Sequence, residues 1–180
     1  MTQTSSHQIL LSVLIPAYNE EAVISSTVEN LVASLNKAIG KFEILIVNNN
    51  STDNTEAIAK ALARKHKQVA MVNTYNGQGY GVAVRCGLEH FSGSHVAIYM
   101  ADESEKPEDL LALFDSIQTG ADCAFGTRFA GTHRVSDYPI SKLIINRMAN
   151  FILSLLLAFR YDDFTTVSYT HLRAHETLLY

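Results

Sequence analysis

The stretch HVAIYMADESEKPEDL, residues 95–110, decides the fold of this sequence. Small and apolar residues from His95 to Ala101 have the length and character of a buried β-strand. That run ends in three clustered carboxylates, Asp102, Glu103 and Glu105. Pro107 then follows, at a position typical of the first turn of a helix. The stretch therefore predicts a strand, a polar loop and a helix in direct succession.

The same alternation extends in both directions from this stretch. Short apolar runs predict strands at residues 9–15, 42–47, 69–73, 95–100 and 122–126. Apolar spacing of three and four residues predicts helices at residues 19–39, 51–66, 79–91, 107–117 and 138–159. Asn19 is the expected N-cap of the first helix, Thr52 or Asp53 that of the second, and Gly40 ends the first.

Strands that alternate with helices predict an α/β fold, with a Rossmann-like, mostly parallel sheet and helices on both faces. The strands are almost continuously apolar, as expected for a sheet covered on both sides. Ligands of such sheets bind beyond the carboxyl ends of the strands. The polar clusters PAYNEE (16–21), NNNSTD (48–53) and the carboxylates after residue 101 all follow strands. A site is therefore expected at this edge.

Net charge, cysteine spacing and the length of apolar runs exclude several functional classes. The chain has 180 residues and a formal net charge of −4, which argues against a nucleic-acid partner. Cys86 and Cys123 form no CxxC pair and no metal-ligand spacing, which favours free thiols in a reducing compartment. The polar N-terminus lacks the pattern of a signal peptide. The apolar run 151–159 is too short to span a membrane.

The C-terminal residues resemble a sequence that does not come from a natural protein. Val167–Thr177 resembles, letter for letter, the translation of a transposase adapter used in sequencing libraries. We therefore expect residues 166–180 to be non-native read-through that packs against nothing, and the domain to be cut near Thr165. The expected organisation is a disordered tail at 1–8, one incomplete domain at 9–165, and this adapter segment.

A glycine cluster, NGQGYG at residues 76–81, suggests a dinucleotide fingerprint at first sight. Its GxGxG spacing follows the third predicted strand, whereas the fingerprint requires the turn after the first strand and an acidic residue at the end of the second. The second strand here is followed by Asn48. We interpret the glycines as a turn that permits close approach of the backbone.

Four segments in order carry a family resemblance: SVLIPAYNEEAVI (12–24), EILIVNNNSTDNT (43–55), NGQGYGVAVRCGLEHFSGSHVAIYMADESEKPED (76–109) and GTRF (126–129). They resemble the inverting family 2 glycosyltransferases with a GT-A fold. The likeness is greatest to polyprenyl-phosphate sugar transferases of the dolichol-phosphate mannosyltransferase type, and it covers residues 9–165. The resemblance implies a nucleotide-sugar donor, linked to UDP or GDP, held by Mg²⁺ or Mn²⁺.

The family's DxD metal motif aligns with Met100, Ala101 and Asp102. The first Asp is replaced by Met100, so the resemblance implies Asp102 as the metal ligand and catalytic residue. Ser104 matches a position that can add a second oxygen, and Glu103 or Glu105 can substitute. Hard cations of this kind prefer oxygen ligands. The alternative is that these carboxylates only cap the helix at Pro107.

The resemblance also implies the nucleotide-sugar contacts: Pro16, Ala17, Tyr18, Glu20, Asn48, Asn49, Asp53, Gly79 and Ala101. Asn48 and Asn49 stand where many members have Asp-Asp, so the base would meet a neutral amide acceptor. Tyr18 can equally serve the turn, and Asp53 can equally cap a helix. The neutral acceptor that Asn48 and Asn49 offer leaves the choice between a uracil and a guanine donor open.

Arg128 in GTRF matches an arginine that meets donor phosphate, where a planar guanidinium gives bidentate contact. We assign it as the second catalytic residue; Arg134 and Arg147 are weaker candidates. No general base stands out, which suits an acceptor that is already an anion, such as a lipid phosphate. Residues 138–159 predict a helix with a broad apolar face, either a core helix or one lying at a membrane interface.

Together these features predict a metal-dependent, inverting hexosyltransferase. It would move sugar from a nucleotide sugar to a polyprenyl phosphate, dolichyl or undecaprenyl. Its expected location is cytoplasmic, peripheral at or tethered to a membrane surface. The alternatives are a family 2 transferase with a glycan or other alcohol acceptor, and a degenerate nucleotide-sugar-binding module without turnover. Met100 in the motif keeps the last alternative open.

Overall fold

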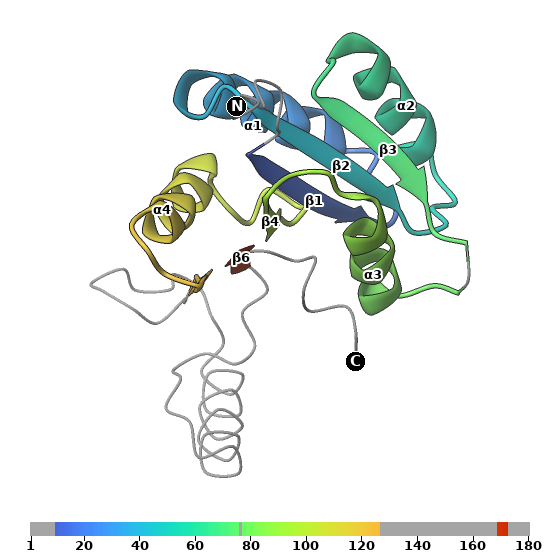
Figure 1. The fold of residues 1–180 in the computed structure, drawn as a ribbon. Helices are drawn as coiled ribbons and strands as arrows, with labels where there is room; N and C mark the ends of the chain where they lie inside the picture. The colour runs from blue at the N-terminus through green and yellow to red at the C-terminus, as the bar shows by residue number, and fades with distance from the viewer. Residues whose placement is uncertain (1–9, 76, 127–168, 173–180) are drawn as a thin grey trace, which may run out of the picture.

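The computed structural model describes residues 10–75, 77–126 and 169–172. They form one sheet with strand order β3-β2-β1-β4-β6-β5 (Figure 1). The bounds of the strands are β1 Leu11–Ala17, β2 Phe42–Asn48, β3 Val69–Asn73, β4 His95–Ile98, β5 Cys123–Phe125 and β6 Tyr169–Leu172. β3, β2, β1 and β4 are parallel, and β6 pairs antiparallel with both β4 and β5. The predicted mostly parallel α/β sheet is confirmed.

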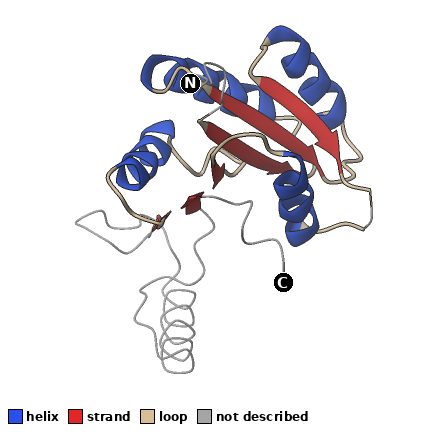
Figure 2. Cartoon of the chain, viewed as in Figure 1, coloured by secondary structure: helices blue, strands red, loops and turns tan. Residues whose placement is uncertain are grey.

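Four described helices connect these strands, as Figure 2 shows in blue. Their bounds are α1 Ile24–Ala38, α2 Thr55–Lys65, α3 Tyr80–His90 and α4 Pro107–Gln118. Each follows a parallel strand, as right-handed βαβ connections require. Pro107 stands at the start of α4, as expected from its fixed φ and missing N–H.

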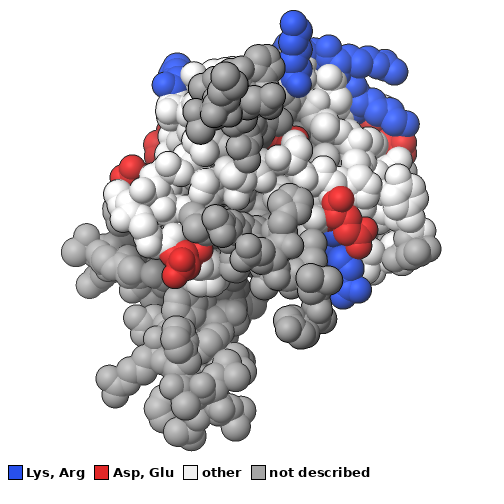
Figure 3. All heavy atoms as spheres, in the orientation of Figure 1, with Lys and Arg blue, Asp and Glu red and all other residues white. Residues whose placement is uncertain are grey.

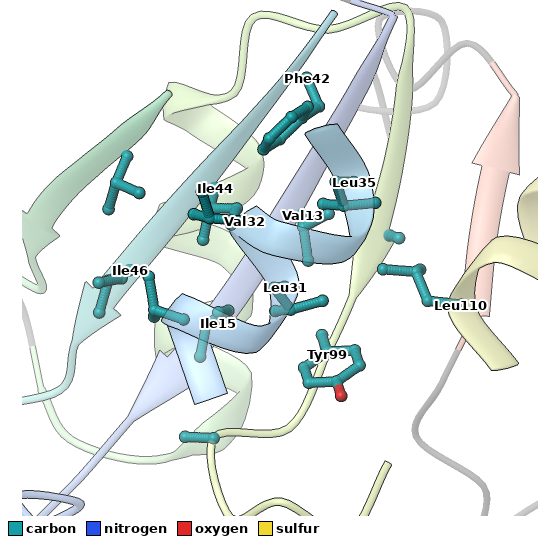
Figure 4. Close-up of a cluster of buried hydrophobic side chains, with 14 of the residues drawn as sticks. Val13, Ile15, Leu31, Val32, Leu35, Phe42, Ile44, Ile46, Tyr99 and Leu110 are labelled. Carbon is teal, nitrogen blue, oxygen red and sulfur yellow. The ribbon is translucent and has the colours of Figure 1, made fainter. Parts of the chain in front are cut away.

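One face of the sheet packs against α1, α2 and α4. Val13 and Ile15 of β1 and Ile44 and Ile46 of β2 point toward Leu31 of α1 in this cluster (Figure 4). All five side chains are fully buried. A buried Leu or Ile contributes about 1.5–3 kcal/mol, so this layer supplies much of the stability.

The other face packs against α3. Leu14, Val47 and Ile98 form a second cluster there with Ala83 and other residues of α3. At Gly87 an added Cβ would lie 3.0 Å from Leu14 Cδ1 and 3.2 Å from Val47 Cγ2. The absent side chain therefore lets α3 lie close to the sheet. Helices on both faces are thus confirmed.

The predicted caps of the first two helices are wrong. Asn19 lies five residues before α1, in the left-handed region with φ 57°, and Val23 occupies the N-cap without a side-chain bond. Asn54 stands at the N-cap of α2, where Thr52 or Asp53 was expected. Gly40 does follow α1 with φ 72°, as predicted. The reason for the misplaced Asn19 is non-local: its side chain accepts bonds from another loop.

The expectation that the C-terminal segment packs against nothing is also wrong. Tyr169–Leu172 form β6, in register with His95–Ala97 on one side and Cys123–Phe125 on the other. The physical reason is that β4 and β5 each present backbone donors and acceptors that an antiparallel strand satisfies. The adapter origin of residues 166–180 and the domain bounds 1–8 and 9–165 stay predictions.

Charge is distributed unevenly over the described surface. Figure 3 shows Lys and Arg side chains gathered along the upper edge of one face, with Asp and Glu side chains in small separate groups. Arg64 and Lys65 occupy the last turn of α2, where they complement the helix dipole. None of the helices in the described ranges is long and apolar enough to cross a membrane.

Candidate functional site

The loops that follow β1, β2, β3 and β4 all leave the same edge of the sheet, because the four strands are parallel. Three non-glycine residues on these loops have positive φ: Asn19 at 57°, Asn50 at 58° and Glu103 at 58°. A left-handed backbone costs about 1–2 kcal/mol for an ordinary L-residue, least for Asn. Strain of this kind gathers at functional edges, and Glu103 carries it without the help of an Asn side chain.

The loops after β1 and β2 are tied together by side chains. Asn19 Oδ1 accepts a bond from Thr52 N at 2.8 Å. Thr55 Oγ1 accepts one from Glu20 N at 2.8 Å and donates to Asp53 Oδ1 at 2.6 Å. Thr55 is fully buried. The two loops therefore form one unit around the start of α2.

Asp53 holds both sides of this unit. Its Oδ2 accepts a bond from Glu21 N at 3.1 Å, and its Oδ1 accepts one from Thr55 N at 2.9 Å. Burial by itself would raise the pKa of Asp53, but the hydrogen bonds from Thr55 and Glu21 outweigh it and lower the pKa. The carboxylate is thus kept charged, and much of its capacity is used for loop structure. Asp53 therefore stabilises the loop that precedes α2, and its contact with a nucleotide sugar stays a prediction.

Asn48 and Asn49 are both buried at the end of β2. Asn48 Nδ2 donates to Asn73 Oδ1 at 2.8 Å, and Asn48 Oδ1 accepts from Ser51 N at 3.3 Å. Asn49 Oδ1 accepts from Gly79 N at 3.3 Å. The two amides therefore fasten the loops after β2 and β3 and the start of α3.

The glycine turn is hydrogen-bonded to the side-chain amides of Asn49 and Asn50 in the loop after β2. Gly77 has φ 90° and Gly79 has φ 133°, so both adopt a backbone that side chains disfavour. Asn50 Nδ2 donates to Gly77 O at 3.1 Å. The close backbone approach expected of this cluster is present.

The loop after β4 closes on itself. Glu105 Oε2 accepts a bond from Met100 N at 3.1 Å, and Tyr99 Oη donates to Glu105 O at 2.6 Å. Asp102 Oδ1 accepts from Ser104 N at 3.1 Å. Asp102 and Ser104 are exposed, whereas Ala101 between the strand and the loop is buried. The predicted metal ligands Asp102 and Ser104 are therefore exposed to solvent, on a loop whose backbone is held by these hydrogen bonds.

Burial raises the pKa of Glu105 to about 7, the bond from Met100 N opposes that rise, and the charges of Asp102 and Asp109 add to it. Burial also raises the pKa of Tyr99, and the negative charge of Glu105 is the next largest cause. Glu105 is therefore a poor choice for a permanently charged ligand. Of the two carboxylates named as substitutes, the exposed Glu103 keeps more contact with solvent.

Three carboxylates from three different loops share one electrostatic environment. Burial raises the pKa of Glu20, and the negative charges of Asp102 and Asp53 raise it further. Like charges gathered in this way destabilise one another until a cation or a proton arrives. Glu20, Asp53 and Asp102 are therefore near enough for the charges of Asp53 and Asp102 to act on the Glu20 carboxyl group.

The donor set fits a hard divalent cation that shares its coordination with a ligand. Within the described ranges, no three His, Cys, Asp or Glu side chains lie together as a ready-made metal cage. Mg²⁺ sites typically use one or two carboxylates, with phosphate oxygens and water completing the shell. Asp102 and Ser104 supply oxygen donors of that kind at the sheet edge.

The remaining predicted residues are placed as follows. Ala17 is buried at the end of β1 and Pro16 is half-buried. Tyr18, the first residue after β1, is 45% exposed. Arg128, Arg134 and Arg147 lie outside the described residues, as does the predicted helix 138–159. The predicted site residues within the described ranges all lie at or just beyond the carboxyl ends of the parallel strands, and their roles stay predictions.

The sequence did not predict that two buried threonines join the loops of the site. Thr55 joins the first two loops, and Thr27 of α1 donates from Oγ1 to Ala101 O at 2.9 Å. One signal was available for Thr27: it stands in the apolar stripe of α1, between Ile24 and Leu31. A hydroxyl on a buried stripe requires a partner, although sequence alone does not name it.

Comparisons with known proteins agree with this geometry. Residues 12–174 match the family described as Glycosyl transferase family 2. The chain is 32% identical over 160 residues to polyprenol monophosphomannose synthase of Mycolicibacterium smegmatis, covering 85% of this chain and 58% of that protein. It is 30% identical over 142 residues to dolichol-phosphate mannosyltransferase of Pyrococcus furiosus, covering 77% of this chain and 39% of that protein. The chain thus spans about two fifths to three fifths of these relatives.

Among solved structures, glucosyl-3-phosphoglycerate synthase from Mycobacterium tuberculosis in complex with uridine diphosphate matches with a TM-score of 0.69. The identity is 22%, and the match covers 91% of this chain and 57% of that one. The same enzyme with Mn²⁺ and UDP-glucose gives a TM-score of 0.70 at 21% identity, covering 91% and 56%. The expected GT-A type of fold is confirmed.

Proposed function

The chain belongs to glycosyl transferase family 2, and from this premise we propose that it moves a sugar from a nucleotide sugar to a polyprenyl phosphate. The observation that carries the proposal is the similarity to polyprenol monophosphomannose synthase over 85% of this chain. The electrostatic influence of Asp102 and Asp53 on Glu20 at the carboxyl edge is consistent with it, and the three segments that contain these residues are all part of the matched region.

In the proposed reaction the acceptor phosphate oxygen attacks the anomeric carbon as the bond to the nucleotide diphosphate breaks. Attack from the opposite face inverts the configuration at that carbon. A bound Mg²⁺ or Mn²⁺ would neutralise the charge that develops on the diphosphate. The acceptor is an anion before the reaction, so no side chain has to remove a proton from it.

The residues of this chain would divide the work by position. Asp102 and Ser104 would hold the cation beside the diphosphate. Tyr18, exposed at the end of β1, offers an aromatic face to the nucleoside. The buried amides of Asn48 and Asn49 would act mainly by fixing the loops around the nucleotide. Arg128 would complete the phosphate contacts. A lipid acceptor would place the protein at the cytosolic surface of a membrane.

Direct assay of transfer tests this proposal. The full chain is incubated with MnCl₂, a short-chain polyprenyl phosphate and either UDP-glucose or GDP-mannose, and lipid-linked sugar is separated from free sugar. Product formed with one donor, lost with EDTA and restored by Mn²⁺, supports the proposal. Transfer to an added alcohol or glycan instead would establish the alternative acceptor class. Binding of UDP or GDP without transfer to any acceptor would establish a binding module.

A further inference from the structure

The first turn of α1 contacts the loop after β4 at two points. Thr27 Oγ1 lies 2.9 Å from Ala101 O, and Ser26 Oγ bonds to Glu103 Oε1. These partners flank Asp102 on both sides. Neither α1 residue belongs to the predicted site.

The two contacts are not equivalent. Thr27 and Ala101 are 3% and 2% exposed, so water cannot replace their bond. Ser26 and Glu103 are exposed, and an exposed bond of this kind competes with water at little net gain. The Thr27 contact is therefore the one that can fix the loop.

The Thr27 hydroxyl is committed to Ala101 although a local acceptor lies near. Its Oγ1 is 3.0 Å from Val23 O, one turn earlier in α1. That carbonyl already accepts the helical bond from Thr27 N at 3.0 Å. The single hydroxyl proton of Thr27 is thus best used on the carbonyl of Ala101.

We propose that Thr27 is a positioning residue that fixes the backbone presenting Asp102. The inference rests on the proposed function in so far as Asp102 holds the cation. Ala101 precedes Asp102 directly, so a free Ala101 carbonyl would allow the peptide to rotate and move the carboxylate. The strained backbone of Glu103, with φ 58°, is held on the far side of the same carboxylate.

The test compares four chains: wild type, Thr27→Val, Thr27→Ser and Thr119→Val. Valine keeps the volume of Thr27 and removes its hydroxyl, whereas serine keeps the hydroxyl. Thr119 is a matched control, because its Oγ1 donates only locally, to Ser116 O at 2.9 Å, and it is exposed. Amide hydrogen exchange without ligand is measured over residues 100–105 and, for comparison, over β1 and β2.

Exchange at residues 100–105 should accelerate about tenfold in Thr27→Val, with β1 and β2 unchanged. It should return to the wild-type rate in Thr27→Ser and stay there in Thr119→Val. Unchanged exchange in Thr27→Val overturns the inference. An equal acceleration in β1 and β2 also overturns it, because that reports a general loss of stability.

Calorimetry with UDP and GDP, each with and without MnCl₂, separates this inference from the proposed function. If wild type binds with Mn²⁺, Thr27→Val should lose about fivefold to tenfold of the metal-dependent affinity, and Thr27→Ser should retain it. Equal affinities in the two variants would overturn the positioning role. If wild type binds neither nucleotide, the proposed function fails and the exchange result alone decides the role of Thr27.

Discussion

Glu105 Oε2 accepts a hydrogen bond from Met100 N at 3.1 Å, so the last residue of the acidic loop returns to its first. The family resemblance aligns Met100 with the first Asp of the DxD metal motif, and that alignment stays a prediction. Glu105 therefore brings a carboxyl group to the backbone N–H of Met100. Its role there is structural, since it bonds the backbone and burial raises its pKa.

Replacing Asp102 by Ala should remove the metal-dependent part of nucleotide diphosphate binding. Its carboxylate is exposed, so the free energy of unfolding should change little. The affinity for UDP or GDP with Mn²⁺ should fall by more than about 100-fold, because even outer partners of a metal ligand contribute about 10–100-fold. Calorimetry checks this, with Asp115→Ala on α4 as the exposed control. Unchanged affinity would move the assignment to Glu103.

Replacing Glu105 by Gln should alter how stability depends on pH. The folded pKa of about 7 lies above the unfolded value of 4.5, so the folded state holds the proton more tightly. Its contribution is therefore fully present below pH 4.5 and is lost as pH rises through 7. Without added metal, Glu105→Gln should be more stable than wild type at pH 8 by on the order of 1–2 kcal/mol after solvent screening. Urea unfolding at pH 5 and pH 8 measures this, and a constant difference would contradict it.

Replacing Thr55 by Val should destabilise the joined loops after β1 and β2. The change removes the acceptor for Glu20 N and the donor to Asp53. Leaving a buried polar group unsatisfied costs about 1–3 kcal/mol, and the N–H of Glu20 is part-buried, so a loss at the lower end of that range is expected. Chemical denaturation should report a loss of that size, and Thr55→Ser should recover most of it. A fully stable Thr55→Val would show that water fills the place of the hydroxyl.

Replacing Gly87 by Ala should destabilise the packing of α3 on the sheet. The added methyl group would press on Leu14 and Val47, and overpacking costs about 1–3 kcal/mol against a helix-propensity gain of up to about 1 kcal/mol. Gly81→Ala is the matched control in the same helix, because an added Cβ there meets nothing within 4 Å. Thermal unfolding should show a lower melting temperature for Gly87→Ala and an unchanged or higher one for Gly81→Ala. Equal melting temperatures would mean that Leu14 moves aside at no cost.

The sequence predicted the parts of the fold that depend on local patterns. Strands β1 to β4 are apolar runs, and Pro107 and Gly40 mark helix ends by backbone geometry of their own. It also predicted which loops carry the site, because parallel strands end at one edge. Asn19 was misassigned as a cap because its partner, Thr52, lies in another loop.

Contacts between distant segments could not be predicted in the same way. Thr27 pairs with Ala101, 74 residues away, and nothing local to either residue names the other. The pairing of Tyr169–Leu172 with β4 depends on backbone groups, which every residue except proline provides. Such a strand is favoured by the unpaired backbone groups of its neighbours in the sheet as well as by its own side chains.

The place of β6 between β4 and β5 sets an order of events during synthesis. The β3-β2-β1-β4 half can assemble as soon as residues through β4 have left the ribosome, since all its pairings lie within that length. β5 emerges next, and within the described residues it joins the sheet through β6, which is made much later. Until then the outer side of β4 is an open edge, the kind of surface that pairs with other chains. A nascent chain of this protein would therefore be most prone to aggregate in the interval between these two strands.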